Sequence, residues 1–333
     1  MSAGHLTVAE AQSLAEAVLT SAGTRPAAAK SVAHALVLAE CDGQSGHGLS
    51  RLIPYAEQVT SGKVDGTVEP VVTQPRPATV YIDAACGFAF PAIDAALPEL
   101  VRIAPEQGLA AAALARSHHF GVAGHPVERL ARNGLIALAF SNSPAAIAPW
   151  GGHRPLYGTN PIAFAVPRAQ GEPVVVDLSL SKVARGKVMV AAQRDEAIPE
   201  GWAVDADGRP TADADAALAG SMLPAGDAKG AALAFMVEVL SVALTGSHFG
   251  FQASSFFVAE GNPPAIGQLL VAIDPGGFGY EGTHAQIETL LGAMTAQEGV
   301  RLPGARRFEL RAAAERDGLI VDGDLLARLR ART

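Results

Sequence analysis

The chain has 333 residues, of which 49% are hydrophobic and 17% are charged, a composition typical of a packed globular protein and not of a disordered chain. This length is sufficient for one large domain or for two lobes. The formal net charge is −8, and no run of basic residues is longer than the pair Arg306-Arg307. The chain therefore lacks the basic surface expected of a protein that binds nucleic acid or an anionic membrane.

Redox and targeting features favour a soluble protein of the cytoplasm. The two cysteines, Cys41 and Cys86, lack the spacing of a zinc site or a disulfide framework, so we expect reduced thiols. Residues 1–7 lack the basic and apolar regions of a signal peptide. The most apolar stretch, Ala231–Leu244, is shorter than the roughly 20 residues that a bilayer requires, and we expect a buried helix there.

The first part of the chain, residues 1–67, is predicted to be helical and to carry a functional loop. A T-x-x-E capping box starts at Thr7 and precedes apolar residues at helical spacing. Pro26 opens a second helix, which runs to about Cys41. The next segment, Asp42–Gly48, contains three glycines and is predicted to be a loop held between two ordered elements.

The central part, residues 78–310, contains both helical and strand patterns. Helical patterns cover Ala89–Ile103 and Thr283–Thr295. Strand patterns occur at Thr79–Asp83, Leu109–Ala115, Leu135–Phe140, Ile162–Val166, Val174–Leu178 and Leu269–Ile273.

These elements do not alternate strictly, so the class is α/β or α+β with a mixed sheet of unknown strand order. We expect one unit of two interleaved lobes over residues 1–333. The proline-rich segment Val68–Pro77 is the expected connector between the lobes, and residues 311–333 are the expected C-terminal helix.

Three glycine-rich or acidic motifs have unremarkable interpretations. Gly277–Gly282 is a literal GxGxxG between a strand and a helix, as a dinucleotide fingerprint requires. However, only about 50 residues follow it and Pro275 interrupts the passage from strand to loop, so a turn is the better interpretation. Asp205–Gly208 lacks the remaining ligands of a calcium loop and is predicted to be a polar turn. Gly226–Gly230 lacks the Ser or Thr of a P-loop.

The segment Ser117–Gly121 (SHHFG) follows a predicted strand and holds two adjacent histidines. In an extended chain His118 and His119 point to opposite faces, and no carboxylate is near in sequence, which disfavours a metal site. A structural turn and a loop that faces a ligand both remain open, because ligand contacts usually lie on loops at strand ends.

His47 and Arg51 are four residues apart and share a face if the chain turns into a helix there. A histidine can give up a proton in a reduction. An arginine fork matches a carboxylate in a bidentate manner. The pair fits a small carboxylic acid with a reducible neighbouring group, and a satisfied loop histidine beside a surface arginine is the alternative.

Eight segments occur in a recognisable order. They are DGQSGHGLSRL (42–52), SHHFG (117–121), GTNP (158–161), VVDLSLSKVARGKV (175–188), IPEGWAVDADG (198–208), LPAGDAKG (223–230), IDPGGFG (273–279) and RLPGARR (301–307). This series resembles the malate/L-lactate dehydrogenase-like family of oxidoreductases, and within it the Δ1-piperideine-2-carboxylate/Δ1-pyrroline-2-carboxylate reductases. The resemblance covers about residues 6–330, and GTNP and ARGK are its specific segments.

The resemblance implies an α/β fold with a mixed, largely antiparallel sheet, distinct from the Rossmann fold, in an NAD(P)H-dependent homodimer without a metal. It implies that His47 is the catalytic proton donor and that Arg51 and Thr159 bind the substrate. The implied cofactor contacts are His119, Phe120, Gly121, Val122, Ala123, Asp177, Leu178, Ser179, Ala228, Lys229, Arg301, Arg306 and Arg307.

The chain departs from the pattern of the imine-reducing members at two positions. Gly46 stands where they usually carry a serine before the catalytic histidine, and Ser45 is the nearest replacement. Lys187, typical of the malate-type branch, stands where they carry a relay aspartate, for which Asp177 is the nearest acidic alternative. The double histidine and the pair Asp42-Gly43, by contrast, are typical of the imine reductases.

We therefore expect NADPH-dependent reduction of Δ1-pyrroline-2-carboxylate to L-proline or of Δ1-piperideine-2-carboxylate to L-pipecolate. The alternatives are an NAD(P)-dependent malate- or lactate-type dehydrogenase and an inactive relative that binds nucleotide. NADPH is favoured over NADH because Arg301, Arg306 and Arg307 can meet a 2′-phosphate. Exposed ion pairs of these arginines with Glu309 or Glu315 are the alternative.

Overall fold

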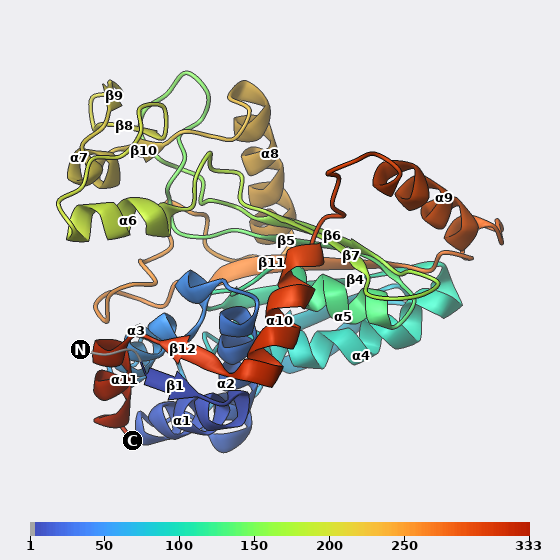
Figure 1. The fold of residues 1–333 in the computed structure, drawn as a ribbon, viewed down its shortest axis with the longest axis horizontal. Coiled ribbons are helices and arrows are strands. Elements are labelled where there is room, and N and C mark those ends of the chain that lie inside the picture. The colour runs from blue at the N-terminus through green and yellow to red at the C-terminus, as the bar shows by residue number, and fades with distance from the viewer. Residues whose placement is uncertain (1–3) are drawn as a thin grey trace.

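A seven-stranded sheet forms the centre of the computed structural model, which describes residues 4–333 (Figure 1). Residues 1–3, which belong to the segment 1–7 that lacks the features of a signal peptide, lie outside the described residues. The strands in sheet order are β2 (Val71–Arg76), β3 (Thr79–Asp83), β4 (Leu109–Ser117), β11 (Ile266–Ile273), β5 (Ile136–Ser141), β6 (Ile162–Val166) and β7 (Val174–Leu178). Only β3 and β4 pair in parallel. The prediction of a mixed, largely antiparallel sheet is confirmed.

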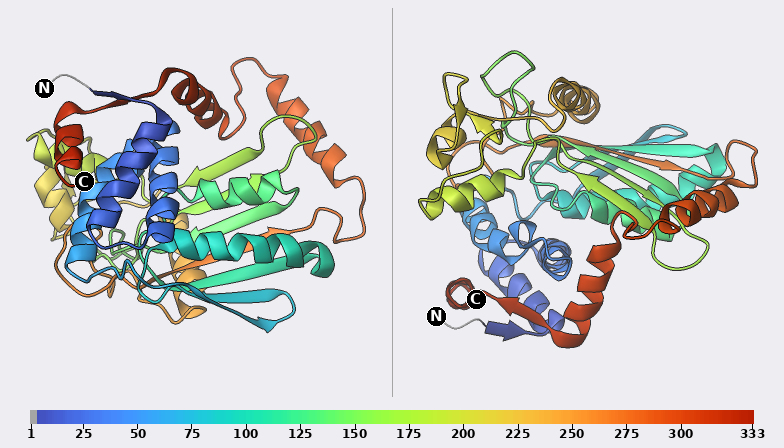
Figure 2. Two further views of the ribbon diagram at one scale, coloured as in Figure 1. Left: turned by 90° about the horizontal axis from the view of Figure 1, so that it is seen from below. Right: turned by 45° about the horizontal axis from the view of Figure 1, so that its top comes forward.

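Helices cover both faces of this sheet. The long helix α4 (Ala89–Gln107) and α5 (Gly124–Arg132) lie across one face, as Figure 2 shows. On the other face lies α8 (Ala228–Glu238), which continues as a π-helical turn over Val239–Ala243. Alternate residues of the strands are buried against α4 and α5, and these residues belong to the largest hydrophobic core.

The N-terminal helices pack beside the sheet as part of the same core. The Thr7 capping box starts α1 (Val8–Ser21), and Pro26 is the first residue of α2 (Pro26–Cys41), both as predicted. After α2 the chain forms two short 3-10 turns, Ser45–His47 and Leu49–Arg51, and then α3 (Leu52–Thr60).

The C-terminal segment returns to these helices. Helix α10 (Ala305–Asp317) packs on α2, and β12 (Leu319–Val321) pairs with β1 (Gly4–Leu6) before α11 (Gly323–Arg330). Residues 311–333 are therefore not one helix as expected, because Gly318 ends α10 with a positive φ of 78°. The division into interleaved lobes stays a prediction.

Smaller elements extend from both ends of the sheet. Helices α6 (Arg185–Gln193) and α7 (Ala214–Ala219) and strands β8 (Ala203–Val204), β9 (Pro210–Thr211) and β10 (Ser221–Met222) surround a second hydrophobic cluster. Helix α9 (Thr283–Thr295) lies at the other end and buries Leu291 against β6 and β7. None of the helices within residues 4–333 has both the length and the hydrophobicity that crossing a bilayer requires.

Two segments are more ordered or more exposed than the sequence predicted, because of what lies beside each of them in space. The supposed connector Val68–Pro77 contains β2, an exposed edge strand, where prolines are tolerated because the outer N–H groups need no partner. The apolar stretch Ala231–Leu244 is helical but only half buried. Its outer face exposes Leu233, Phe235, Val239 and Leu244.

The glycine-rich motif at Gly277–Gly282 is a turn, as predicted. It follows β11, which is antiparallel to both of its neighbours, so the parallel β-α-β unit of a dinucleotide-binding fold is absent at this position. The Cβ of any residue replacing Gly277 would lie 2.6 Å from Gly108 Cα, which explains this glycine by close packing. Asp205–Gly208 is likewise a polar turn between β8 and β9, in which Asp205 Oδ1 accepts from the Asp207 amide.

Candidate functional site

The loop between α2 and α3 brings His47 and Arg51 to one place. Its two 3-10 turns are tied back to α2, because Leu49 N donates to Glu40 Oε2 over 2.9 Å. Gly48 lies against the same carboxylate, and a Cβ at this position would be 2.1 Å from Glu40 Oε2. Gly48 therefore permits close packing of the loop against α2.

Arg51 is a half-buried arginine without an acidic partner among residues 4–333. Its Nε donates to the Gly46 carbonyl over 2.6 Å, and its guanidinium carbon lies 4.4 Å from the centre of the Phe257 ring. Its Nη1 is buried without a hydrogen-bond partner, and burial lowers the pKa of this side chain. An unpaired guanidinium edge in such surroundings favours a bound carboxylate.

The His47 ring lies beside that arginine and stacks on the His119 ring, with centroids 5.3 Å apart and planes 17° apart. Burial, and then the positive charge of Arg51, lower the pKa of His47 to about 4. His47 Nδ1 is buried without a partner. The imidazole is therefore neutral at pH 7 and can accept a proton from a bound group.

The two histidines of SHHFG both turn toward α3. Tyr55 Oη and His119 Nδ1 are 2.6 Å apart, and His118 Nε2 and Gln58 Oε1 are 2.7 Å apart. Both rings also contact Phe256. The opposite orientation that an extended chain would give does not apply here, because β4 ends at Ser117.

Sequence reasoning missed three residues of this cluster. Tyr55 and Gln58 follow Arg51 by four and seven residues, a spacing that places all three on one helical face and could have been used. Phe256, more than a hundred residues away, carried no sequence signal.

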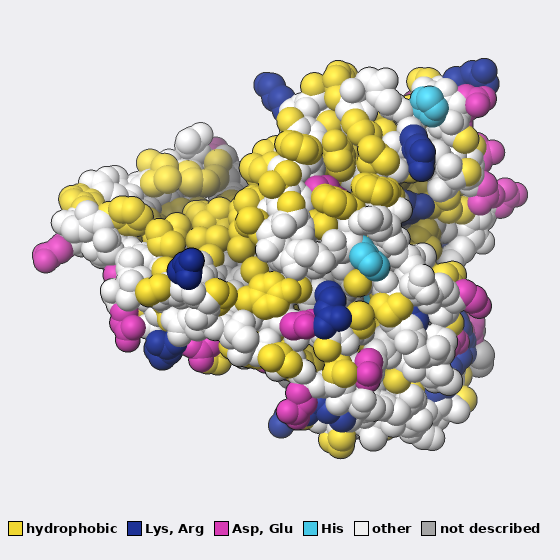
Figure 3. Space-filling view, turned by 180° about the vertical axis from the view of Figure 1, so that it is seen from behind, with side chains coloured by type: hydrophobic (Ala, Val, Ile, Leu, Met, Phe, Trp, Pro, Cys, Tyr) yellow, Lys and Arg dark blue, Asp and Glu magenta, His cyan; other side chains and the backbone are white. Residues whose placement is uncertain are grey.

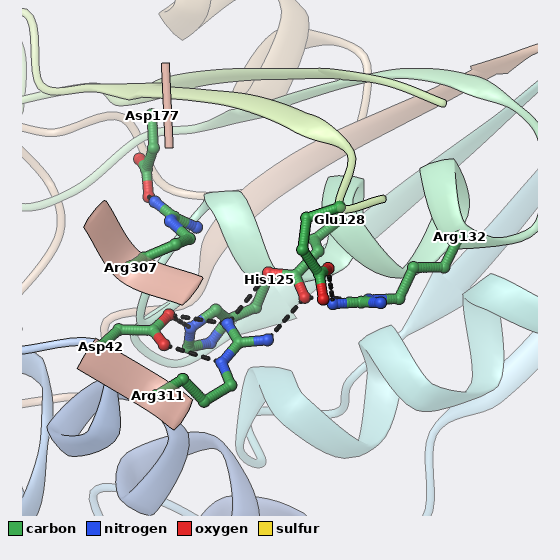
Figure 4. A network of polar contacts seen from close by, with 8 residues as sticks. Asp42, His125, Glu128, Arg132, Asp177, Arg307 and Arg311 are labelled. Atoms are coloured by element: carbon green, nitrogen blue, oxygen red, sulfur yellow. Dashed lines mark hydrogen bonds and ion pairs between the residues drawn. The ribbon is translucent and has the colours of Figure 1, made fainter. Parts of the chain in front are cut away.

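A second set of polar contacts, between Asp177, Arg307 and the start of α5, connects segments that were predicted to contact the cofactor (Figure 4). Asp177, at the end of β7, accepts a hydrogen bond from Gly124 N at the start of α5 over 2.9 Å. Arg307 Nη2 donates to the same carboxylate over 3.3 Å, and its Nη1 is buried without a partner. An unpaired guanidinium nitrogen beside a helix N-terminus can receive an anion such as a phosphate. Asp177 does not contact Lys187 or His47 through any bond among the described residues.

Asp42 anchors the start of the loop between α2 and α3 in a buried charged network, also drawn in Figure 4. Arg311 of α10 donates to both oxygens of Asp42 over 2.9 Å and to Glu128 of α5 over 2.6 Å. His125 Nε2 lies 3.0 Å from Asp42 Oδ2. One arginine of the C-terminal segment therefore holds both the loop that carries His47 and α5.

Thr159 lies between Ser143 and the end of β7. Its amide donates to Ser143 Oγ over 3.0 Å, and its carbonyl accepts from Leu180 N over 2.8 Å. The buried carboxylate of Glu238 orders this turn, because Glu238 Oε1 accepts from Asn160 Nδ2 over 3.0 Å. Burial raises the pKa of Glu238.

The remaining predicted residues have fewer contacts. Ala228 and Lys229 start α8, in a segment joined to the chain after β7 by the Ala225 N to Leu180 O hydrogen bond. Arg301 and Arg306 are exposed and form no ion pair with Glu309 or Glu315. Phe120, Val122 and Ala123 are buried, and the side chains of Ser45 and Lys187 are exposed.

Among residues 4–333, no three His, Cys, Asp or Glu side chains are grouped as a metal site requires. The two polar groups described above, the His47–Arg51–His119 cluster and the Asp177–Arg307 pair at the start of α5, are the candidate substrate and cofactor regions.

The sequence matches the family described as malate/L-lactate dehydrogenase over residues 6–330. A (2R)-3-sulfolactate dehydrogenase (NADP(+)) of Chromohalobacter salexigens is 58% identical over 306 residues, which cover 92% of this chain and 91% of that protein. A Delta(1)-pyrroline-2-carboxylate/Delta(1)-piperideine-2-carboxylate reductase of Pseudomonas putida is 42% identical, covering 94% and 92%.

Solved structures are similar over nearly the whole chain. A delta1-piperideine-2-carboxylate reductase from Pseudomonas syringae has a TM-score of 0.90 at 38% identity, covering 99% of this chain and 100% of that one. A sulfolactate dehydrogenase from Methanocaldococcus jannaschii has a TM-score of 0.89 at 29% identity, covering 99% and 96%.

Proposed function

The chain belongs to the malate/L-lactate dehydrogenase family of oxidoreductases, as its sequence motifs predicted, and we propose that it is an NADP-dependent dehydrogenase of a 2-hydroxy acid of the sulfolactate class. The observation that carries the chemistry is the unpaired guanidinium edge of Arg51 beside the neutral imidazole of His47. The relative that is 58% identical supports the substrate class and the cofactor.

In the oxidative direction the chain's own residues would bind the acid and move its proton. Arg51 holds the carboxylate through its terminal nitrogens, and neutral His47 accepts the proton of the 2-hydroxyl group. His119 stacks on the His47 ring and limits its motion. Bound NADP would supply the hydride acceptor, and the same groups act in reverse when a 2-oxo acid is reduced.

The Asp177 region fits a nucleotide cofactor. The unpartnered Nη1 of Arg307 offers a donor to a phosphate, and Asp177, which Gly124 N holds in place, offers a carboxylate to a hydroxyl group. Arg301 and Arg306 add exposed positive charges nearby in sequence that no carboxylate neutralises within residues 4–333.

Reduction of a cyclic 2-imino acid, the activity expected first from the sequence, is the second candidate. The reductases that are 42% and 38% identical and the double histidine of SHHFG favour it. Gly46 and Lys187 disfavour it, because they stand where the family resemblance leads us to expect the serine and the aspartate of imine-reducing members.

A substrate panel separates these candidates. The purified protein is assayed with NADP and (2R)-3-sulfolactate, lactate or malate, and with NADPH and pyrroline- or piperideine-2-carboxylate. We expect the highest kcat/KM with sulfolactate. A higher value with either cyclic imine would replace the first candidate by the second, and no turnover in any assay would favour a nucleotide-binding relative without activity.

We further infer that a second copy of the chain covers the outer face of α8. Leu233, Phe235, Val239 and Leu244 are exposed there, and hydrophobic side chains gather across the middle of the face in Figure 3. Exposed apolar surfaces of this kind are typical of subunit interfaces. The proposal agrees with the homodimer implied by the family resemblance.

Sedimentation equilibrium tests this arrangement. The wild-type protein should have twice the monomer mass, and Phe235→Glu should reduce it to the monomer mass, because a carboxylate cannot be buried without a partner. The control is Phe278→Glu, which changes an exposed phenylalanine on the glycine-rich turn and should leave the dimer intact. A monomeric wild-type protein, or a dimeric Phe235→Glu variant, would refute the interface.

A further inference from the structure

Lys63 is a buried lysine just after α3, with 2% of its surface exposed and no ion pair among the described residues. Its Nζ donates instead to three backbone carbonyls, those of Ser255 over 2.6 Å, Val258 over 2.9 Å and Glu260 over 2.8 Å. An ammonium group has three N–H donors. One short segment, residues 255–260, therefore uses all of them.

Two neighbours of Lys63 bind the same segment. Gln58 Nε2 donates to the Val258 carbonyl over 3.0 Å, and Ser61 Oγ donates to the Ala259 carbonyl over 2.9 Å. The segment itself contains no helix or strand, so these bonds replace the ladder that regular structure would supply. Burying a cation is costly unless its donors are satisfied. That three carbonyls of one segment satisfy the donors of Lys63 indicates that this lysine has a specific role there.

The fastened segment carries two phenylalanines that face the candidate substrate site. The Phe256 ring lies 4.9 Å from the His119 ring. The Phe257 ring lies under the Arg51 guanidinium, 4.4 Å from its carbon atom to the ring centroid. The segment therefore contacts both the histidine cluster and the proposed carboxylate ligand.

These contacts fix the plane of the Arg51 guanidinium. The bond from Nε to the Gly46 carbonyl holds one edge, and Phe257 covers one face. The edge formed by Nη1 and Nη2 is left for a ligand, and Nη1 is buried without a partner. A bidentate contact with a carboxylate requires this fixed orientation.

We propose that Lys63 is a positioning residue for the substrate carboxylate, acting through Phe257 on Arg51. The proposal rests on the proposed function, since it takes Arg51 as the carboxylate ligand. A lysine that only stabilised the fold would lower the melting temperature when replaced and would leave KM unchanged. A positioning lysine changes KM, and its effect depends on Phe257.

Steady-state kinetics and a double-mutant cycle test the proposal. The variants are Lys63→Met, Phe257→Leu and the double variant, each assayed with the best substrate of the panel. Lys63→Met keeps the length of the side chain and removes its three N–H donors. The control is Lys30→Met, an exposed lysine of α2. We expect KM to rise about tenfold in each single variant, with a smaller change in kcat.

The double variant should be little worse than either single variant, because both act on one contact. Multiplicative effects, or an unchanged KM in Lys63→Met, would overturn the proposal. If Lys63→Met does not fold, Phe257→Leu must still raise KM, and an unchanged KM there would overturn it too.

A second measurement does not depend on turnover. Phenylglyoxal modifies accessible arginines, and mass spectrometry reports the rate at Arg51. We expect faster modification of Arg51 in Lys63→Met and Phe257→Leu, with no change at the exposed Arg301. Faster modification without turnover on any substrate would refute the proposed function and keep the positioning role, whereas unchanged modification would refute the positioning role.

Discussion

His47 illustrates how much of the proposed chemistry depends on the surroundings of a single residue. Burial is the larger cause of its low pKa, and the charge of Arg51 is the next. A carboxylate bound to Arg51 offsets that charge, so the substrate itself raises the proton affinity of the imidazole. The base therefore strengthens when its substrate is in place.

Replacing Arg51 by Gln should raise the pKa of His47, because a positive neighbour is removed while burial remains. His47 must be neutral to accept a proton, so kcat/KM for hydroxy-acid oxidation falls below its pKa, which is about 4 in the native protein. In the variant this fall should begin at higher pH, and KM should increase.

The pH dependence of kcat/KM measures the shift, with the exposed Arg76→Gln as control. His47→Asn should lower kcat by roughly 10²–10⁴ and abolish the pH dependence. An acid limb at the same pH in native protein and Arg51→Gln would contradict this role of the arginine.

Cofactor preference is predicted to depend on Arg301 and Arg306 rather than on Arg307. Arg307 is buried and paired with Asp177, so its replacement disturbs the site for either cofactor. Arg301→Ala combined with Arg306→Ala should weaken NADPH binding far more than NADH binding, since only NADPH has the 2′-phosphate. Fluorescence titration with both cofactors measures the two Kd values, and equal losses would show that these arginines do not read the phosphate.

At the scale of elements, the sequence predicted best where the signals are local. The capping box at Thr7, Pro26 at the start of α2 and the valines of β7 all lie within or directly beside the elements that they specify. The residues of the candidate site were likewise predictable only where the signal is local. The spacing of His47 and Arg51 was readable, whereas Phe257 reaches Arg51 only through the tertiary fold.

Helix α10 connects the elements that carry the site. Arg307 lies on Asp177, and Arg311, one turn later, lies between Asp42 and Glu128. Asp42 is fully buried and Glu128 is 5% exposed, so both carboxylates depend on this arginine. Burial alone would raise the pKa of both carboxyls. Hydrogen bonds from His125 and Arg311 hold the pKa of Asp42 below its usual value, and the bond from Arg311 does so for Glu128.

Arg311→Met should therefore lower the free energy of unfolding by about 3–5 kcal/mol, because it leaves two buried carboxylates without their main partner. Urea unfolding at neutral pH measures the loss. The matched control is Arg316→Met on the same helix, whose ion pair with Asp317 is exposed to solvent and should contribute little to stability. Equal losses in the two variants would contradict this account of α10.

For the whole molecule, composition and length predicted the class of fold but not its topology. The order of seven strands depends on pairings between distant segments, such as β11 between β4 and β5, which no local pattern specifies. The family resemblance supplied the antiparallel sheet that periodicity alone left open.

Three buried histidines should make the molecule sensitive to mild acid. Burial lowers the pKa of His47 to about 4, that of His118 to about 3, and that of His119 well below 6.5. All three are neutral in the folded protein, whereas the unfolded chain protonates them near pH 6.5. The unfolded state binds more protons below that pH, so stability falls as pH is lowered.

The raised pKa values of Glu40 and Glu238 act in the opposite sense at lower pH, because these carboxyls bind protons more readily when folded. Between about pH 6.5 and about 5.5 the histidines should dominate, each contributing up to about 1.4 kcal/mol per pH unit. Urea unfolding across this range should show a smaller slope for His118→Gln. The same slope as in the native protein would contradict the prediction.

The pairing of β1 with β12 and of Asp42 with Arg311 has a consequence during synthesis. Arg311, the partner of Asp42, is synthesised 269 residues later in the chain. At about 5–20 residues per second, this interval lasts roughly a quarter of a minute to a minute. Throughout it Asp42, at the start of the loop after α2, lacks its two hydrogen bonds from Arg311, so the complete charged network can form only after nearly the whole chain has been synthesised.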